Sequence, residues 1–310
     1  MAVDFRDLVQ ARVHFGHRTT RWCPKMAPFI WGHKNHIHLI NVAKTAVCLD
    51  NAAQFIQKIA QEKKQILWVG TKKVASQVIE DTAKRLDDPY VSNRWIGGTV
   101  TNFSQVKKSV TKLKHFEDIL EKSSEFSYTK KELNKIQKTV EKLRANVSGI
   151  ADLIYPISAI VVVDVRKESA AIREAVNAGI PVVALVDTNA DPSDIDYVIP
   201  ANDDAVSSVT FIINYLANAA QIGKDHAKKA AAEKKEQEAS EKKAQETPPE
   251  EQESVIVDNE DEAQEEDADA KKTKKIKRSL STRTAKRSMK RNEKKEVGSI
   301  KEEKGSKISE

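Results

Sequence analysis

Apolar and polar positions follow two distinct rhythms along the first 222 residues. Short apolar runs have the length and composition of buried strands, at residues 65–70, 90–92, 159–164, 181–187 and 197–199. Amphipathic stretches with helical periodicity lie before, between and after these runs, at residues 41–64, 72–86, 168–178 and 203–222. Strands that alternate with helices predict an α/β fold with a parallel sheet and helices on both faces.

Residues 105–147 follow a different pattern, because apolar residues recur there at heptad spacing on two segments rich in Lys and Glu. These residues are Val106, Val110, Leu113, Phe116 and Leu120, then Leu133, Ile136, Val140, Leu143 and Val147. A turn at 123–128 separates the segments, and Thr129 with Glu132 forms a capping-box signature. We predict an inserted antiparallel helical coiled-coil hairpin that projects from the domain. The alternative is two helices lying flat on the sheet, but the narrow seam favours projection.

The composition changes after Gly223. Residues 224–310 contain no Phe, Tyr or Trp, so they cannot bury enough apolar surface to offset the entropy of ordering. Residues 224–243 can extend the preceding helix; an acidic block at 246–269 and a basic block at 271–291 follow. The basic block either binds nucleic acid or forms a solvated polyampholyte with its acidic neighbour.

The chain is therefore predicted to have three parts: an α/β domain of residues 1–104 and 148–223, the hairpin of residues 105–147, and a disordered, low-complexity charged tail of residues 224–310.

Overall composition narrows the class of protein. The 310 residues include 52 Lys and Arg against 46 Asp and Glu, a net charge of +6. No run of about 18 apolar residues exists, so a membrane-spanning helix is not expected. The first residues do not resemble a signal or transit peptide. Two cysteines, Cys23 and Cys48, cannot form a disulfide framework. We expect a soluble cytoplasmic protein.

Signatures of enzymes are weak. Gly70 to Lys73 form a strand-to-helix turn that could hold a phosphate, but neither common glycine-rich nucleotide motif occurs in the sequence. Carboxylates follow the predicted strands, at Asp164, Asp187, Asp191, Asp194, Asp203 and Asp204. They either cap turns and helices, which we favour, or bind a divalent ion with a nearby His. We predict no catalytic residue and no cofactor.

The segment between Leu8 and Leu49 is more informative. It holds six basic residues, five of the seven His and several aromatic residues, but no acid. Basic side chains contact phosphates, and aromatic or His rings stack on unpaired bases, which favours RNA binding. The alternatives are a loop-rich lobe with scattered charge and a zinc site, whose ligands would need tighter pairing. The candidate RNA-binding residues are Arg12, His14, His17, Arg18, Arg21, Trp22, Lys25, Lys34 and His36.

A second candidate is the glycine-containing loop at residues 93–103, which also lacks acid. It contributes Asn93, Arg94, Thr99 and Asn102 to the predicted RNA-binding set, and Lys72 joins them from the turn at Gly70. The alternative is a tight turn anchored by Trp95, and both interpretations can hold together.

Several long motifs occur in a fixed order. They are VHFGH at 13–17, WCPKMAPFI at 22–30, IHLIN at 37–41, LWVGTK at 67–72, NRWIGGTVTN at 93–102, IPVVALVDTN at 180–189 and IPANDDA at 199–205. This set resembles the family of the second protein of the small ribosomal subunit over roughly residues 4–222. The hairpin resembles the insertion of the bacterial-type branch. The resemblance does not extend to residues 224–310.

The resemblance implies a flavodoxin-like domain that is a structural constituent of the small ribosomal subunit. It implies binding to small-subunit ribosomal RNA at the head–body junction, late joining during assembly and support of translation. The implied protein partners are neighbouring small-subunit proteins, including the large first one where the organism has it. No membrane or small-molecule substrate is implied.

The resemblance also implies, for some members, a zinc ion near the base of the hairpin. Spacing does not assign its ligands, and His17 with Asp187, Asp191 or Asp204 is one alternative, so we assign no metal. Two other functions stay open: an enzyme that uses the strand-end carboxylates, and an interaction scaffold that acts through the hairpin and tail.

Overall fold

The structure is a computed structural model that describes residues 3–122 and 128–245, with the backbone alone for residues 231–245. The chain divides into two units, Met1–Thr247 and Pro248–Glu310, and all described residues belong to the first. The predicted acidic and basic blocks at 246–269 and 271–291 lie outside the described residues. Among the described helices, none is long and apolar enough to cross a membrane.

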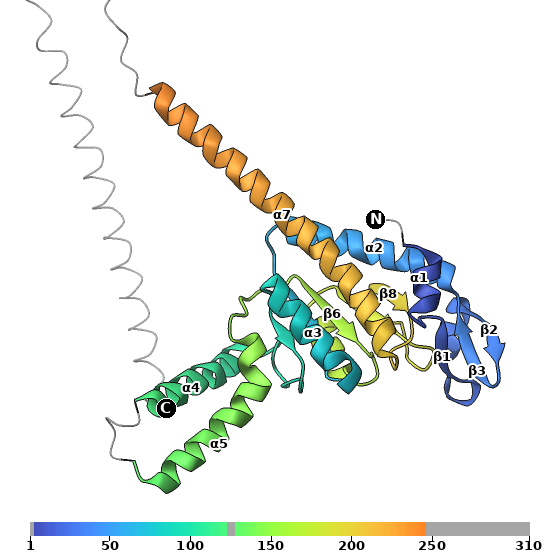
Figure 1. The fold of residues 1–310 in the computed structure, drawn as a ribbon, viewed down its shortest axis with the longest axis horizontal. Coiled ribbons are helices and arrows are strands. Elements are labelled where there is room, and N and C mark those ends of the chain that lie inside the picture. Colours follow the sequence, from blue (N-terminus) through green and yellow to red (C-terminus); the bar gives the residue numbers. More distant parts are fainter. Residues whose placement is uncertain (1–2, 123–127, 246–310) are drawn as a thin grey trace, which may run out of the picture. The chain divides into compact units, whose positions relative to one another are not determined.

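A five-stranded parallel sheet forms the centre of the described unit (Figure 1). Its strands are β4 (Ile66–Val69), β5 (Tyr90–Val91), β6 (Ala159–Val163), β7 (Val182–Val186) and β8 (Tyr197–Pro200). They lie in the order β5-β4-β6-β7-β8, and each neighbouring pair is parallel. Counted among the strands of this sheet alone, that order is 2-1-3-4-5, as in flavodoxin-like folds. The predicted strands and the α/β class are confirmed.

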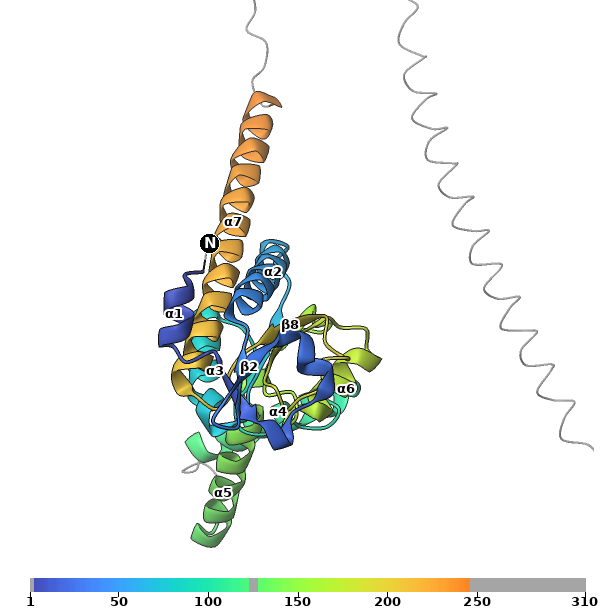
Figure 2. The ribbon, with the colours of Figure 1, turned by 90° about the vertical axis from the view of Figure 1, so that its right-hand side faces the viewer.

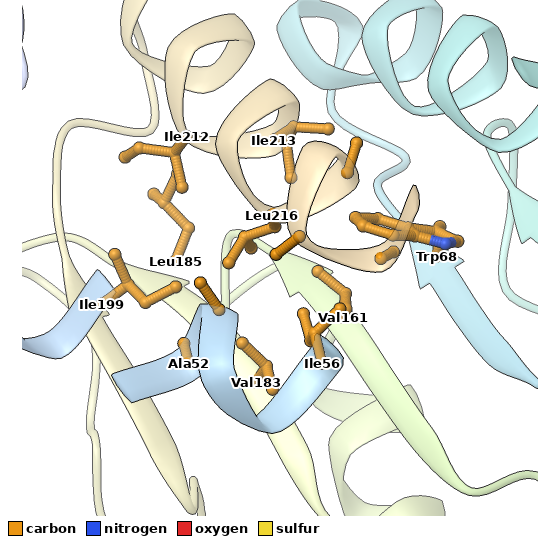
Figure 3. Close-up of a cluster of buried hydrophobic side chains, with 14 of the residues drawn as sticks. Ala52, Ile56, Trp68, Val161, Val183, Leu185, Ile199, Ile212, Ile213 and Leu216 are labelled. Carbon is orange, nitrogen blue, oxygen red and sulfur yellow. The ribbon is translucent and has the colours of Figure 1, made fainter. Parts of the chain in front are cut away.

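Helices cover both faces of this sheet, as predicted. One face carries α2 (Val42–Gln61), α3 (Lys73–Leu86) and α7 (Val206–Gln245), and the other carries α6 (Ser169–Asn177). Strand side chains alternate between the faces: Trp68 packs in the first cluster, whereas Leu67 and Val69 pack in the second. Ile56 of α2 and Leu216 of α7 close the first cluster over the sheet (Figure 3).

The predicted insertion forms two helices that pack against each other, α4 (Phe103–Glu121) and α5 (Lys130–Val147). The buried residues of the predicted seam are Val106, Val110 and Leu113 of α4 and Val140 and Val147 of α5. The capping box at Thr129 and Glu132 is present, and Arg144 of α5 pairs with Glu117 of α4. Residues 123–127 of the predicted turn lie outside the described residues. A short 3-10 helix, η3 (Ser148–Ile150), leads back to the sheet.

A second, antiparallel sheet precedes the parallel one. It consists of β1 (Phe15–Arg18), β2 (Ile30–Lys34) and β3 (Ile37–Ile40) in the order β1-β3-β2. The helix α1 (Phe5–Gln10) precedes β1, and the 3-10 helices η1 (Thr19–Arg21) and η2 (Pro24–Phe29) join β1 to β2. We call residues 15–40 the amino-terminal lobe, which faces the viewer in Figure 2. Its hydrophobic pattern did not predict strands, because they are short and bear register shifts.

Helix α7 runs through the boundary that composition places after Gly223. A Cβ on Gly223 would lie 2.4 Å from the backbone oxygen of Gln57, so this residue sits against α2. The next residue, Lys224, donates a 2.6 Å hydrogen bond to the buried Asp88, and Ala227 is buried too. The packed body therefore extends past Gly223. The sequence assigned residues 224–310 to a charged tail but predicted that 224–243 can extend the preceding helix, and α7 continues to Gln245.

Candidate RNA interface and candidate metal centre

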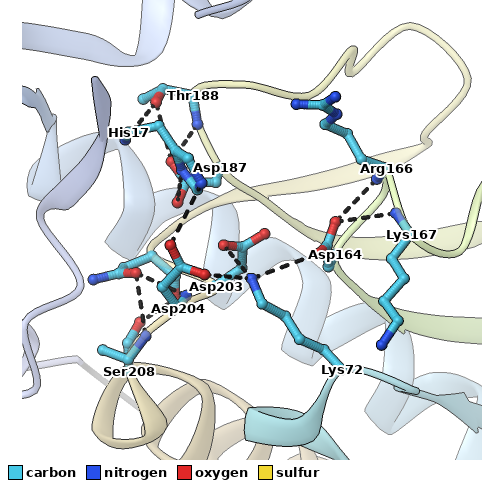
Figure 4. Close-up of polar contacts among 12 residues, drawn as sticks. His17, Lys72, Asp164, Arg166, Lys167, Asp187, Thr188, Asp203, Asp204 and Ser208 are labelled. Carbon is cyan, nitrogen blue, oxygen red and sulfur yellow. Dashed lines mark hydrogen bonds and ion pairs between the residues drawn. The ribbon is translucent and has the colours of Figure 1, made fainter. Parts of the chain in front are cut away.

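Four aspartates gather at the carboxyl ends of the parallel strands (Figure 4). Asp164 follows β6, Asp187 follows β7, and Asp203 and Asp204 lie between β8 and α7. Parallel strands bring their carboxyl ends to one edge of the sheet, where open α/β folds hold ligands. We call Asp164, Asp187, Asp203 and Asp204 the carboxylate cluster.

Lys72 enters this cluster from the turn after β4. Its Nζ lies 2.9 Å from Asp203 Oδ1, 2.6 Å from Asp204 Oδ1 and 3.5 Å from Asp164 Oδ2. Burial lowers the pKa of Lys72, but the hydrogen bonds to Asp204 and Asp203 outweigh it and raise the pKa above its usual value. The ammonium group is therefore firmly held as an internal counter-ion.

His17 reaches the cluster from β1. Its Nδ1 lies 2.9 Å from Asp187 Oδ2 and its Nε2 lies 3.4 Å from Asp204 Oδ2. The backbone N–H of His17 donates to Thr188 Oγ1 at 2.9 Å, which fixes the strand against the end of β7. The residue before it is Gly16, where a Cβ would lie only 2.6 Å from Thr188 Cγ2. The absence of a side chain at Gly16 therefore lets β1 lie against the side chains of Thr188 and Asp187 at the end of β7.

The cluster carries more negative charge than its internal cations balance. Burial, followed by the charge of Asp187, raises the pKa of Asp203 to about 7. The hydrogen bond to Asp187 is the main cause that raises the pKa of His17. The shift of His17 reflects attraction of positive charge to the carboxylates, whereas that of Asp203 mainly reflects its burial.

The donor set fits a divalent cation. His17, Asp187 and Asp203 each offer a ligand atom, and these atoms lie within 4.8 Å of one another. Asp187 is almost fully buried, and its Oδ2 faces Nδ1 of His17 at 2.9 Å. Imidazole nitrogen and carboxylate oxygen are ligands that zinc accepts. Of the aspartates considered beside His17 from the sequence, Asp187 and Asp204 face it and Asp191 does not.

Capping explains two other polar residues of this edge, as the sequence predicts. Asn202 Oδ1 accepts hydrogen bonds from the backbone N–H groups of Asp204 (2.9 Å) and Ala205 (3.3 Å), just before α7. Asp191 accepts from the backbone of Ser193 and pairs with Lys25 at 2.7 Å. The bond to Lys25 is the main cause that lowers the pKa of Asp191 to about 2.

The amino-terminal lobe presents cations on its exterior. Arg18 of β1 and Lys34 of β2 both pair with Ile37 of β3, so their side chains project from the same face of the small sheet. Asn35 and His36 form the two-residue turn between β2 and β3, and both have positive φ, as a type I′ turn requires. His36 therefore lies exposed at the tip of this hairpin, next to Lys34.

Four of the predicted RNA-binding cations from the segment between Leu8 and Leu49 form no ion pair within the described part of the chain. Arg12, Arg18, Arg21 and Lys34 are exposed, and none forms an ion pair with another described residue. Exposed aromatic rings accompany them: Trp22 is 40% exposed and its ring packs 5.3 Å from that of His38. Trp31 is 75% exposed, although sequence reasoning did not include it among the site residues.

Other predicted RNA contacts are placed differently. His17 and Lys72 point into the carboxylate cluster, and Lys25 is bonded to Asp191. Thr99 is buried and donates its hydroxyl to the backbone of Ile96, and His14 is half-buried. These side chains are less available to an external ligand than their spacing in the sequence implies.

Residues 93–102, which we call the arginine loop, lie against the same buried cluster as the lobe. Trp95 of the loop and Met26 of η2 both belong to that cluster, on the α6 face of the sheet. Arg94 and Asn102 are exposed, as is Asn93, whose side chain donates to Asn146 of α5 at 2.9 Å. The loop also contacts Glu174 of α6, which no motif or spacing in the sequence singled out.

Comparison with known proteins identifies the family. A family model described as ribosomal protein S2 matches residues 8–223. The small ribosomal subunit protein uS2 of Psychrobacter cryohalolentis is 43% identical over 226 residues, which cover 73% of this chain and 86% of that protein. The protein of the same name from Cytophaga hutchinsonii is 44% identical over 227 residues, covering 73% of this chain and 89% of its own length. This chain, whose ordered motifs and flavodoxin-like strand order agree with the match, belongs to the ribosomal protein S2 family.

Proposed function

We propose that this protein is a structural constituent of the small ribosomal subunit and binds small-subunit ribosomal RNA through the amino-terminal lobe and the arginine loop. One observation carries the RNA contact. The exposed, unpaired cations Arg12, Arg18, Arg21 and Lys34 lie in a segment that contains no acidic residue between Leu8 and Leu49. The names of the relatives support the ribosomal role.

The proposed binding is electrostatic and geometric. Arginine and lysine side chains displace counter-ions from RNA phosphates, so affinity falls as the salt concentration rises. Trp22 and His36 are exposed beside these cations and offer flat surfaces for unpaired bases. The small antiparallel sheet holds the set in fixed relative positions. Arg94 adds a cation from the arginine loop.

Further details of this role also stand as proposals. They are a location at the head–body junction, late joining during assembly, and contact with neighbouring small-subunit proteins, including the large first one where the organism has it. We propose that the coiled-coil hairpin offers a second contact surface, because Lys131, Lys135 and Lys138 of α5 are exposed. The protein would then reside with ribosomes in the cytoplasm.

A second proposal concerns the carboxylate cluster. We propose that His17, Asp187 and Asp203 hold a divalent cation such as zinc, which would tie β1 to the ends of β7 and β8. The excess of buried carboxylate over Lys72 supports this. An enzymatic use of the cluster has less support, because ribosomal proteins are generally non-enzymatic.

The RNA contact can be tested with matched arginine substitutions. Arg18→Ala and Arg21→Ala should each reduce the slope of log affinity against log salt by about 1, because each removes one phosphate contact. Arg85→Ala, an exposed arginine at the end of α3, serves as the control and should leave the slope unchanged. Binding to purified small-subunit RNA is measured at several salt concentrations. Equal slopes for all variants would refute the assignment.

The ribosomal role is tested separately. Full-length protein should migrate with small subunits in a density gradient, and the combined Arg18→Ala and Arg21→Ala variant should remain folded by circular dichroism but leave that fraction as salt rises. A chain that never enters the subunit fraction would argue against the ribosomal role itself.

A further inference from the structure

Glu174, a residue outside the arginine loop, accepts several hydrogen bonds from it. It lies on α6, at least 72 residues along the chain from the loop, and its two carboxylate oxygens accept hydrogen bonds from several loop donors. Oε1 accepts from the indole N–H of Trp95 at 3.0 Å and from the backbone N–H of Gly98 at 2.9 Å. Oε2 accepts from the backbone N–H of Val100 at 3.2 Å and from the Thr101 hydroxyl at 3.4 Å.

These contacts satisfy backbone N–H groups that form no hydrogen bond within the loop itself. Within the loop, Thr99 N–H donates to Ile96 O at 3.1 Å and Asn102 N–H donates to Gly98 O at 2.8 Å. Gly98 and Val100 direct their N–H groups to Glu174 instead. The successive backbone N–H groups of Val100 (3.2 Å) and Thr101 (3.5 Å) both point at Oε2, an arrangement that favours an anion.

The position of this carboxylate is costly for RNA binding if charge alone matters. Residues 93–103 contain no acid, and Arg94 and Asn102 at their surface are exposed. Burial raises the pKa of Glu174, but the bonds from Gly98, Trp95 and Val100 outweigh it and lower the pKa, so the group is anionic at neutral pH. A negative charge beside a surface that binds a polyanion opposes binding. Charge alone therefore gives no reason for RNA binding to favour Glu174 at this position.

We propose that Glu174 is a positioning residue for RNA binding, which holds the arginine loop in the conformation that presents Arg94 to the RNA backbone. This inference rests on the proposed RNA contact of the loop. α6 is a suitable support, because Ala171, Ile172 and Ala175 anchor it in the core on either side of Glu174. Rigid support of a contact group increases affinity, because less order must be imposed on binding.

The proposal predicts an effect of opposite sign to that of charge. Glu174→Ala should weaken binding of the full chain to small-subunit RNA by about tenfold, the equivalent of one charge-assisted hydrogen bond. Charge alone would make the same variant bind more tightly. Glu174→Gln should fall between, because its amide oxygen can still accept from Trp95 or Gly98, whereas its NH₂ cannot accept from Val100. Asp152→Asn, at an exposed carboxylate of another loop, is the charge-matched control and should not weaken binding.

Two further measurements separate the inference from the proposed function. Arg94→Ala should weaken RNA binding, and the Arg94→Ala, Glu174→Ala double variant should bind no more weakly than the weaker single variant, because both changes act on the same contact. Hydrogen exchange of the Gly98 and Val100 amides should accelerate in Glu174→Ala without RNA present.

If Arg94→Ala weakens binding and Glu174→Ala does not, the positioning role is wrong. If Arg94→Ala has no effect, the RNA contact of the loop is wrong, and the positioning role falls with it.

Discussion

The carboxylate cluster and the amino-terminal lobe use similar cations for opposite purposes. In the cluster, Lys72 is surrounded by Asp164, Asp203 and Asp204, and its charge is neutralised inside the fold. In the lobe, Arg18 and Lys34 project from one face of a small sheet and pair with no acid in the described chain. All three were predicted from the sequence to contact RNA, Arg18 and Lys34 in the acid-free segment and Lys72 in the turn at Gly70. The difference shows that the number of basic residues does not reveal which charges a partner can use.

The largest expected effect contrasts one cation of each kind. Lys72→Met should lower the free energy of unfolding by about 3 kcal/mol, because it leaves carboxylates without their counter-ion in a largely buried site. Lys34→Met, at an exposed and unpaired lysine, should change it by less than about 0.5 kcal/mol. Urea unfolding in chelator-containing buffer measures both. Equal losses in the two variants would remove the distinction between the cluster and the lobe.

A divalent cation should add stability only through the cluster. At a free zinc concentration of 100 times the dissociation constant, the free energy of unfolding should rise by about 2.7 kcal/mol. His17→Ala should abolish this gain, because it removes the single nitrogen ligand of the set. Asp191→Asn should preserve it, because Asp191 is bonded to Lys25 and does not face His17. A gain that survives His17→Ala would show that zinc binds elsewhere.

The pH dependence of stability should identify the cluster as a strained anionic site. The folded pKa of Asp203 is about 7 against an ordinary 3.8, so its contribution is fully present below about pH 3.8 and is lost as pH rises through 7. The raised pKa of His17 acts in the same direction, with stability lost above its ordinary 6.5. Without metal, stability should therefore fall from pH 5.5 to pH 8, with a slope of at most about 1.4 kcal/mol per pH unit for each group.

Asp203→Asn should flatten this profile, whereas Asp194→Asn, at an exposed aspartate nearby in sequence, should not. Denaturation midpoints at intervals of half a pH unit would suffice. A stability that rises toward pH 8 would contradict the sign derived for Asp203.

Substitution of the exposed arginines of the amino-terminal lobe should have the smallest effect on stability. Arg18→Ala and Arg21→Ala should each leave the free energy of unfolding within about 0.5 kcal/mol of that of the unchanged chain, because neither side chain has a charged partner to lose. The same variants are expected to bind RNA less well. Thermal unfolding measured beside RNA affinity checks both, and a parallel loss of stability and affinity would mean that the lobe's arginines support the fold.

Local patterns predicted the parallel sheet well and the amino-terminal lobe poorly. The strand at 159–164 was evident because Ile160 to Val163 form a continuous β-branched run, as expected where both faces are covered. The strands of the lobe mix polar and apolar residues over four or five positions, so no period could be recognised. The composition changes after Gly223, and α7 continues across this position, as the predicted helix extension over residues 224–243 allows. Lys224 is held by Asp88, which lies 136 residues earlier in the chain.

Some features of the candidate site could likewise be predicted from the sequence, and others could not. Spacing and charge located the acid-free segment, the arginine loop and the strand-end aspartates. They did not reveal that His17, Lys25 and Lys72 are neutralised by carboxylates, nor that Glu174 supports the loop. Asp191 lies 166 residues after Lys25 in the chain, and Asp203 lies 131 residues after Lys72. No local sequence motif connects positions so far apart.

The sequence by itself determined the family, the α/β class and the position of a basic, acid-free segment, because motifs, periodicity and composition are properties of neighbouring residues. Only the tertiary structure decided which basic side chains remain free and which are consumed inside the protein. An ion pair depends on the distance between two groups in space. The fold brings His17 to Asp187 and Lys72 to Asp203, and it leaves Arg18, Arg21 and Lys34 facing outward.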